Sequence, residues 1–104
     1  NLFSKGNYIN GKKTGYWEFY HNNGNIWYKG NYINSEKIGH WEEYFYNGGI
    51  WYKGNYINGE KNGYWVYYDD GKLSSKGNYN NGNLIGYWEY YNNNGKLKDK
   101  TFYI

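Results

Sequence analysis

The segment KGNYIN at residues 29–34, followed by GHWE at residues 39–42, contains the repeating unit of this chain. The unit returns as KGNYIN with GYWE (5–10, 15–18), KGNYIN with GYWV (53–58, 63–66) and KGNYNN with GYWE (76–81, 86–89). A fixed period of about 20 to 50 residues is typical of solenoids, propellers and linear arrays. We therefore interpret the chain as one repeat array: residues 1–24, 25–48, 49–71 and 72–95, with a half-repeat at 96–104 as a C-terminal cap.

The composition requires an unusual core. The 104 residues include 16 Gly, 17 Tyr and 6 Trp, but no Pro, Cys or Met, and the mean hydropathy is −1.18. With so few aliphatic residues, any core must consist of aromatic rings. Without cysteine there is neither a disulfide framework nor thiolate chemistry, so the compartment stays open. Composition alone would indicate prion-like disorder, but the fixed phase of Gly and Trp argues against it.

Charge and hydropathy restrict the partners. A net charge of +3, with lysines spread evenly, does not indicate nucleic acid or an anionic membrane. No apolar run is long enough for a signal peptide or a transmembrane helix. Because the sequence begins at Asn1 rather than at Met, we interpret it as a processed or excised segment of a longer protein.

Each repeat contains two extended segments, such as residues 2–9 and 14–20. They are rich in Tyr, Trp and Ile and are bounded by the hairpin signals Asn10-Gly11 and residues 22–24. No segment has apolar residues at helical spacing. The sequence predicts an all-β fold, an elongated, twisted, single-layer antiparallel β-meander of about nine strands, with no helix longer than one turn and no dense core.

The register follows from two hairpins. We close the first on Ile9 and Thr14, across a four-residue loop, and the second on the two-residue turn at residues 23–24. Both place a lysine opposite a glutamate, as in Lys5 opposite Glu18, and such pairs stabilise a sheet by roughly 0.2–1 kcal/mol each. In the third repeat, a loop at residues 70–72 with a glycine bulge restores the phase.

The same register predicts two rows in which large rings lie over strand glycines on both sides and fix the pairing. We interpret these residues as structural. The first row is Gly6, Trp17, Gly30, Trp41, Gly54, Trp65, Gly77 and Trp88, and the second is Tyr8, Gly15, Tyr32, Gly39, Tyr56, Gly63, Tyr79, Gly86 and Tyr103.

The opposite face has a row of charges beside a row of aromatic residues. The aromatic position is not constant, since Ser74 and Lys98 occupy it later in the chain. An exposed apolar strip of that length is normally covered by a partner, although an aromatic ladder that only stabilises the sheet fits equally well. This candidate binding strip comprises Phe3, Tyr20, Trp27, Tyr44, Trp51 and Tyr68.

The two edges of the predicted sheet differ. The last strand, at residues 96–102, has alternating charges, which is typical of a protected edge. The first strand keeps the internal pattern, so we expect further repeats or a partner strand beside it.

Nothing in the sequence indicates an enzyme, a cofactor or a metal site. His21 and His40 are not at metal-ligand spacing. The glutamates lie between lysines, which lowers a carboxyl pKa and so suits no general acid. No nucleophile–base set and no phosphate-binding glycine loop is present.

The pattern G-x-Y-x-N-G-x-x-x-G-x-W at residues 6–17, with Asn23-Gly24, resembles the MORN (membrane occupation and recognition nexus) repeat. More closely, it is similar to the bacterial variant found in YwqK antitoxin-like proteins, since the older form has Gly where Trp17, Trp41, Trp65 and Trp88 stand. The resemblance implies β-hairpin arrays that serve in protein contact, self-association or, in some members, lipid contact. An antitoxin role is implied only by that likeness.

Three classes of function follow. We favour a non-catalytic scaffold that binds a protein partner or its own copies through the first strand, including assembly into a filament. A carbohydrate- or cell-wall-binding module is the alternative, because Gly-Tyr-Trp hairpins also resemble choline- and glucan-binding repeats. Lipid contact ranks third, since glutamates neutralise the lysines.

Overall fold

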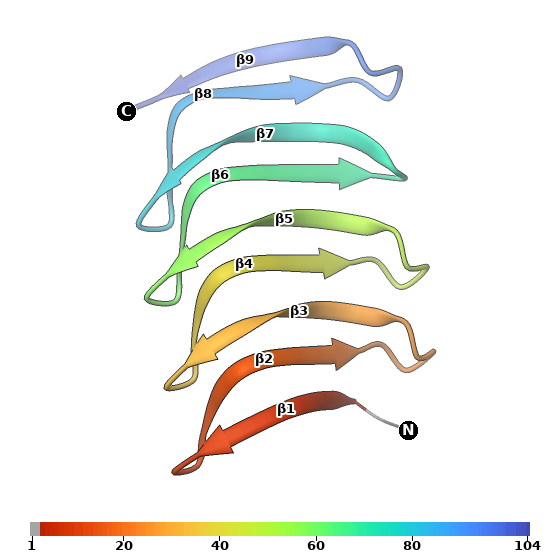
Figure 1. The fold of residues 1–104 in the computed structure, drawn as a ribbon. Coiled ribbons are helices and arrows are strands. Elements are labelled where there is room, and N and C mark those ends of the chain that lie inside the picture. Colours follow the sequence, from red (N-terminus) through yellow and green to blue (C-terminus); the bar gives the residue numbers. More distant parts are fainter. Residues whose placement is uncertain (1–2) are drawn as a thin grey trace.

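The computed structural model describes residues 3–104 and contains nine antiparallel strands in a single sheet (Figure 1). Each strand pairs with the next in sequence, so the order in space is the order in the chain. The strands are β1 (Ser4–Ile9), β2 (Lys12–Tyr20), β3 (Ile26–Ile33), β4 (Glu36–Tyr44), β5 (Ile50–Ile57), β6 (Glu60–Asp69), β7 (Lys72–Asn80), β8 (Asn83–Tyr91) and β9 (Leu97–Tyr103).

The sheet forms an elongated single layer with principal extents of 46 × 32 × 13 Å. The predicted all-β meander is therefore confirmed, and residues 3–104 contain no helix. None of these residues accordingly belongs to a helix long and apolar enough to span a membrane. The expected first strand began at Leu2, which lies outside the described residues. Each even-numbered strand bends sharply near its beginning, which curls the sheet (Figure 1).

The short hairpins differ from the prediction. Ile9 pairs with Lys12, not with Thr14, so the turn contains two residues rather than four. Asn10 and Gly11 have φ angles of 51° and 78°. Two successive positive φ angles are typical of a type I′ turn, whose twist matches that of the strands, and Asn-Gly is its preferred sequence. The four-residue loop was wrong because the local preference of Asn-Gly prevails.

A wide bulge restores the register beyond each short turn. Lys5 pairs with Glu18 and Asn7 with Thr14, so only Gly6 stands opposite residues 15–17. Gly15 enters the bulge at φ 69°, a conformation that non-glycine residues adopt at a cost. The predicted pairing of Tyr8 with Gly15 was therefore wrong, since Tyr8 pairs with Lys13. The bulge also bends the strand, which accounts for the curl of the sheet.

The turns that follow the even-numbered strands also differ from the prediction. The backbone of His21 bonds to that of Asn25, so the two-residue turn predicted at residues 23–24 was wrong. Tyr20 pairs with Ile26 rather than with Trp27, because a bulge follows the pair Phe19–Tyr28. The third such turn is shorter than expected. Asp69 pairs with Lys72 across a two-residue turn, so the predicted three-residue loop at 70–72 was wrong.

Away from the turns, the predicted charge register is confirmed. Glu18 faces Lys5 and Lys29, and Glu89 faces Lys76 and Lys100. In the second row, Gly15, Gly39, Gly63 and Gly86 pair with the tyrosine of the following strand only, namely Tyr32, Tyr56, Tyr79 and Tyr103.

The core is a line of tryptophans. Trp17, Trp41, Trp65 and Trp88 are 0–2% exposed although the sheet has one layer. Each indole covers the glycine of the preceding strand: a Cβ added at Gly54 would lie 2.1 Å from the Trp65 ring. We predicted that each tryptophan would cover a glycine on both neighbouring strands. This is confirmed for the preceding strand only, because the glycine of the following strand is covered by the next tryptophan, as Gly30 is by Trp41.

Tyrosines join these indoles into one continuous row, which has edge-to-face contacts throughout. Tyr32 lies 6.3 Å from Trp17 and 5.0 Å from Trp41 between ring centroids, and Tyr56 lies 6.1 Å from Trp41 and 5.1 Å from Trp65. Such contacts contribute about 0.5–1.5 kcal/mol each beyond the burial of area. The sheet thus has a dense aromatic core on one face, which corrects the expectation that it would have none.

Candidate functional site

The two faces of the sheet differ in chemistry. The face with the tryptophans is called the aromatic face here, and the opposite face, with the Lys/Glu row, the charged face. Among the described residues, two Lys–Glu ion pairs lie on the charged face, Lys29–Glu42 and Lys76–Glu89, each with 3.7 Å between nitrogen and oxygen. Because their side chains are partly exposed, these pairs contribute little to stability, about 0–1 kcal/mol each. What matters for a binding function is where the charged face places hydrogen-bond donors around each glutamate.

The first glutamate of the charged face is held between two tyrosines. The hydroxyl of Tyr16 donates to one oxygen of Glu18 at 2.9 Å, and the hydroxyl of Tyr20 donates to the other. These two bonds lower the pKa of Glu18 below its ordinary value. Burial and the same carboxylate raise the pKa of Tyr16 to about 12. The lowered pKa of Glu18 and the raised pKa of Tyr16 thus keep a charged acceptor beside a neutral donor at neutral pH.

The second and fourth glutamates have related surroundings. Glu42 accepts from the hydroxyl of Tyr44 and, at 2.9 Å, from Nε2 of His40. Partial burial alone would raise the pKa of Glu42, but these hydrogen bonds outweigh it and lower the pKa. Glu89 accepts from the hydroxyl of Tyr91 at 3.0 Å. In three repeats, then, a carboxylate accepts a hydrogen bond from the tyrosine two residues after it, and Glu18 and Glu42 accept a second from the residue two positions before.

The third repeat keeps the donors but lacks the carboxylate. Val66 stands where the other repeats have glutamate, between Tyr64 and Tyr68 along the strand. Lys53 and Lys76 are its cross-strand partners. The surface here is hollowed into a cavity of about 370 Å³. We call it the Val66 niche, lined by His40, Lys53, Gly54, Asn55, Tyr64, Val66 and Tyr68.

The candidate binding strip is divided between the two faces. Tyr20 and Tyr44 lie on the charged face, where they donate to Glu18 and Glu42. Tyr68 lies there too, with Nζ of Lys53 5.8 Å from its ring centroid. Phe3 precedes β1, and its carbonyl accepts from the backbone of Tyr20 at 2.8 Å.

The two tryptophans of the strip contact the aromatic face instead. Trp27 stacks on His21 at 5.3 Å and meets the edge of Tyr28 at 5.0 Å, and Tyr28 in turn stacks on Phe19. Trp51 is placed equivalently, against Phe45 and Tyr52. The bulges at Ile26 and Ile50 cause this division, so the six residues do not form one surface.

Lysines cover the aromatic face. Nζ of Lys37 lies 4.8 Å from the Trp41 ring centroid and 5.0 Å from that of Tyr56. Burial lowers its pKa below the ordinary value. Lys13 and Lys61 lie over the rings of their own repeats in the same way, and Leu84 takes this position in the fourth repeat. An apolar stem, rather than the charge, is the shared feature, so we interpret these lysines as covers of the core.

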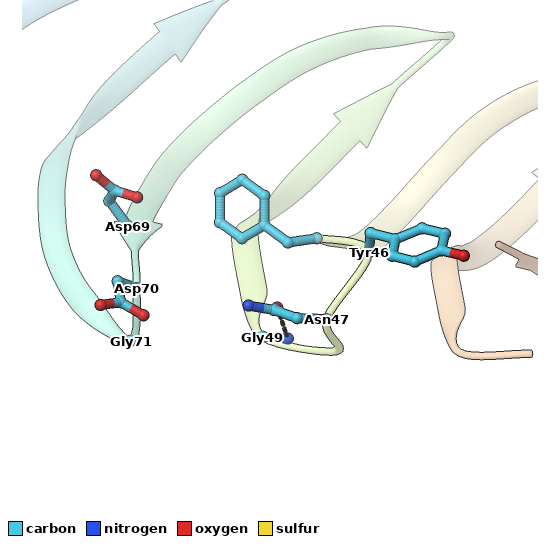
Figure 2. Close-up of a pocket in the computed structure, with 7 residues that line it drawn as sticks. Tyr46, Asn47, Gly49, Asp69, Asp70 and Gly71 are labelled. Carbon is cyan, nitrogen blue, oxygen red and sulfur yellow. Dashed lines mark hydrogen bonds between the residues drawn. The ribbon is translucent and has the colours of Figure 1, made fainter. Parts of the chain in front are cut away.

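A second cavity lies between two of the turns that follow the even-numbered strands. Asn23 and Asn25 donate to the carbonyl of Tyr46 at 2.8 and 3.1 Å, which links the first of these turns to the second. The turn at Asp70 is too short to continue this contact, and a cleft of about 440 Å³ remains. Figure 2 shows Asp69 and Asp70 on one side of it, while the ring of Tyr46 points away from them. The cleft therefore does not present an aromatic pair for stacking on a sugar.

The histidines do not come together. His21 bonds to the carbonyl of Tyr44 and stacks on Trp27, whereas His40 bonds to Glu42 on the charged face. Among residues 3–104, no group of three His, Cys, Asp or Glu side chains could hold a metal ion.

Sequence reasoning missed the Val66 niche, although its signal was present. Val66 interrupts the charge row, while Tyr64, Tyr68 and both flanking lysines keep their repeat positions. Only the hydrogen bonds to Glu18, Glu42 and Glu89 reveal that these positions surround a carboxylate in the other repeats.

The comparisons with known proteins support a repeat module. The family described as the MORN repeat variant matches four tandem segments, residues 13–34, 37–58, 61–81 and 84–104. Each matched segment begins in an even-numbered strand and ends one residue after the following odd-numbered strand. No curated protein matches the chain. Because the four segments span most of its length, the chain belongs to the MORN repeat variant family.

Proposed function

We propose that the chain is a non-catalytic scaffold that binds protein through the edge of its sheet at β1, and that its first partner is a second copy of itself. One observation carries this proposal. Tyr8 of β1 is 61% exposed, whereas Tyr32 and Tyr56, at the same repeat position in β3 and β5, are 7% and 8% exposed. Tyr8 thus occupies a repeat position that is buried in β3 and β5, but at the edge of the described sheet one side of its ring is left uncovered.

The missing neighbour is a strand. Tyr32 is enclosed because Trp17 lies on one side of it and Trp41 on the other. Tyr8 meets Trp17 at 5.0 Å, and β1 is the edge strand of the described sheet. A strand added at β1 would cover Tyr8 and pair the free backbone groups of the edge, which is how β-augmentation gains affinity.

The other edge is less suited to pairing. Strand β9 carries Lys98, Asp99 and Lys100 in succession. Charged side chains on an edge strand discourage the approach of another strand. Two copies that pair β1 with β1 about a two-fold axis form a closed, isologous contact with the strands antiparallel, so one sheet runs through both. The exposed Tyr8 of β1 thus favours pairing with another strand, whereas the charges of β9 oppose it.

The experiment is sedimentation velocity over a range of concentrations, with Tyr8→Lys as the disrupting variant. Phe102→Lys on β9 is the matched control, because Phe102 is similarly exposed at 58%. We expect a concentration-dependent dimer for the original chain and for Phe102→Lys, but a monomer for Tyr8→Lys.

A second variant removes a backbone donor. The carbonyl of Phe3 accepts from Tyr20, so the alternation of an antiparallel pair directs the N–H of Ser4 away from β2. We expect Ser4→Pro to give a monomer as well. A monomer at every concentration for the original chain, or dissociation by Phe102→Lys alone, would contradict the proposal.

A further inference from the structure

We propose that the Val66 niche binds a carboxylate from an Asp or Glu side chain of an acidic peptide segment. That carboxylate would occupy the position that Glu18, Glu42 and Glu89 hold in the other repeats. The niche lies on β5 and β6 beside β7, in the interior of the sheet, and not at the β1 edge. The two proposals therefore stand or fall separately.

The chain itself shows what the donors of this position bind. In the first repeat, the hydroxyls two residues before and after Glu18 each donate to one carboxylate oxygen. Tyr64 and Tyr68 stand at the same two positions relative to Val66. Because a valine has no acceptor, these two hydroxyls have no carboxylate between them. A planar carboxylate supplied from outside would meet the same pair of donors, one for each oxygen.

The cation of the niche is also in place. Nζ of Lys29 lies 5.6 Å from the ring centroid of Tyr44 and pairs with Glu42, and Nζ of Lys76 lies 5.7 Å from that of Tyr91 and pairs with Glu89. Lys53 holds the equivalent distance, 5.8 Å, from the ring centroid of Tyr68. It therefore occupies the position from which two other lysines already contact a carboxylate.

Charge and space favour a single acidic side chain. Val66 leaves Lys53 and Lys76 with no carboxylate between them, although each faces a glutamate on its other side, Glu42 and Glu89. The unmatched positive charge is therefore small and confined to this one position, unlike the clusters of several basic residues that bind anionic membranes. The cavity of about 370 Å³ is open at the surface and exceeds the volume of one carboxylate, so a peptide side chain can enter it.

The test is a titration of the ¹⁵N-labelled chain followed by NMR. The probes are a capped hexaglutamate peptide, sodium acetate and inorganic phosphate, at matched ionic strength. We expect saturable shifts from the peptide at the amides of Lys53, Tyr64, Val66 and Tyr68. Acetate that binds as tightly as the peptide would overturn the assignment to a peptide, and tighter binding of phosphate would overturn the assignment to a carboxylate.

The decisive variant is Val66→Glu, which supplies the carboxylate from within the chain. We expect it to abolish peptide binding and to raise the thermal midpoint, because three sister repeats already hold a glutamate there. Val66→Ala is the matched control, since it keeps every donor and should keep binding. Unchanged binding by Val66→Glu, or a lower thermal midpoint, would contradict the proposal.

Two further variants test the donors. We expect Tyr68→Phe to weaken binding about tenfold, since a hydrogen bond to a charged group contributes about that much. Glu42→Val should create a second niche from Lys29, His40 and Tyr44, and so raise the stoichiometry to two peptides. A Tyr68→Phe variant that binds as well as the original chain, or an unchanged stoichiometry in Glu42→Val, would argue against the assigned donors.

Discussion

The indole nitrogen of Trp65 lies 3.1 Å from the carbonyl oxygen of Asn55 and 3.2 Å from that of Asn62. These carbonyls belong to β5 and β6, the two strands that the wide bulge separates. The indole N–H thus bridges the gap that the bulge opens, and Trp17 and Trp41 bridge the preceding hairpins in the same way. In three repeats the tryptophan is therefore both the core residue and the bridge across the bulge, while Trp88 bonds to the carbonyl of Asn78 on the preceding strand.

We expect Trp65→Ala to lower the free energy of unfolding by about 3–5 kcal/mol, because the side chain is fully buried. Trp65→Phe keeps a ring but loses the bridge, and should cost about 1–3 kcal/mol. Trp27→Ala is the control: that ring is 43% exposed, and its loss should cost about 1 kcal/mol. Urea denaturation measures all three. Equal costs for Trp65→Ala and Trp27→Ala would refute the assignment of the core.

The repeat glycines should separate into two classes. Gly63 has φ 73° and open space where a side-chain carbon would stand, so Gly63→Ala meets only backbone strain, about 1–2 kcal/mol. Gly54→Ala instead drives a methyl group into the Trp65 ring and must displace it. We expect urea denaturation to show destabilisation in both variants, while tryptophan fluorescence in the folded state changes only in Gly54→Ala. A fluorescence change of the same size in Gly63→Ala would contradict this division.

The acid limb of stability should depend on Glu42. Its pKa is lowered in the folded state, since hydrogen bonds from Tyr44 and His40 outweigh the effect of burial. A lowered pKa means that the unfolded state binds the proton first as the pH falls. The stabilising contribution is therefore complete above the ordinary value of 4.5 and is lost as the pH falls below it.

Tyr44→Phe is the variant that tests this contribution. We expect it to lower stability at pH 7 and to reduce the change in stability between about pH 5 and pH 3, measured by urea denaturation. An acid dependence identical to that of the original chain would show that the Tyr44 hydrogen bond does not contribute through Glu42.

Lys37→Leu should stabilise the protein at pH 7. Burial lowers the pKa of Lys37, which means that the folded state disfavours its charge. Leucine keeps an apolar stem over Trp41 and Tyr56, as Leu84 does over the fourth repeat. We expect a gain of about 1 kcal/mol, the size of the apolar burial less the lost cation–π contact. The reverse change, Leu84→Lys, should destabilise, and a loss from both would contradict this interpretation.

The strands and the charge register could be predicted because both are read from the repeat itself. Lys5 opposite Glu18 and Glu18 opposite Lys29 are confirmed. The pairings near the turns could not be predicted by matching side chains. Asn10-Gly11 forms a two-residue turn, as its positive φ angles allow. The residues that this short turn leaves over in β2 enter a bulge at Gly15. A glycine required for its φ angle looks, in sequence, like one that makes room for a ring.

The candidate surfaces were harder to predict for a related reason. The strip through Tyr20 and Trp27 assumed strict alternation of side chains, and the bulge beside Ile26 divides it between the two faces. The Val66 niche depends instead on knowing that Tyr16 and Tyr20 both donate to Glu18. Hydrogen-bond directions of that kind follow from coordinates and not from spacing.

The alkaline limb of stability should depend on the tyrosines of the core. Burial raises the pKa of Tyr32 from 10.0 to about 12, and that of Tyr56 likewise. A raised pKa means that the unfolded state loses its proton first as the pH rises. The stabilising contribution is therefore complete below pH 10 and is lost between about pH 10 and pH 12.

Tyr32→Phe keeps the ring between Trp17 and Trp41 but removes the ionisable group. We expect its stability to fall less steeply than that of the original chain between about pH 10 and pH 12, as measured by urea denaturation. Tyr46→Phe is the control, because the ring of Tyr46 is 56% exposed and lies outside the aromatic row. Equal slopes for Tyr32→Phe and Tyr46→Phe would mean that burial in the row does not protect the Tyr32 hydroxyl from ionisation.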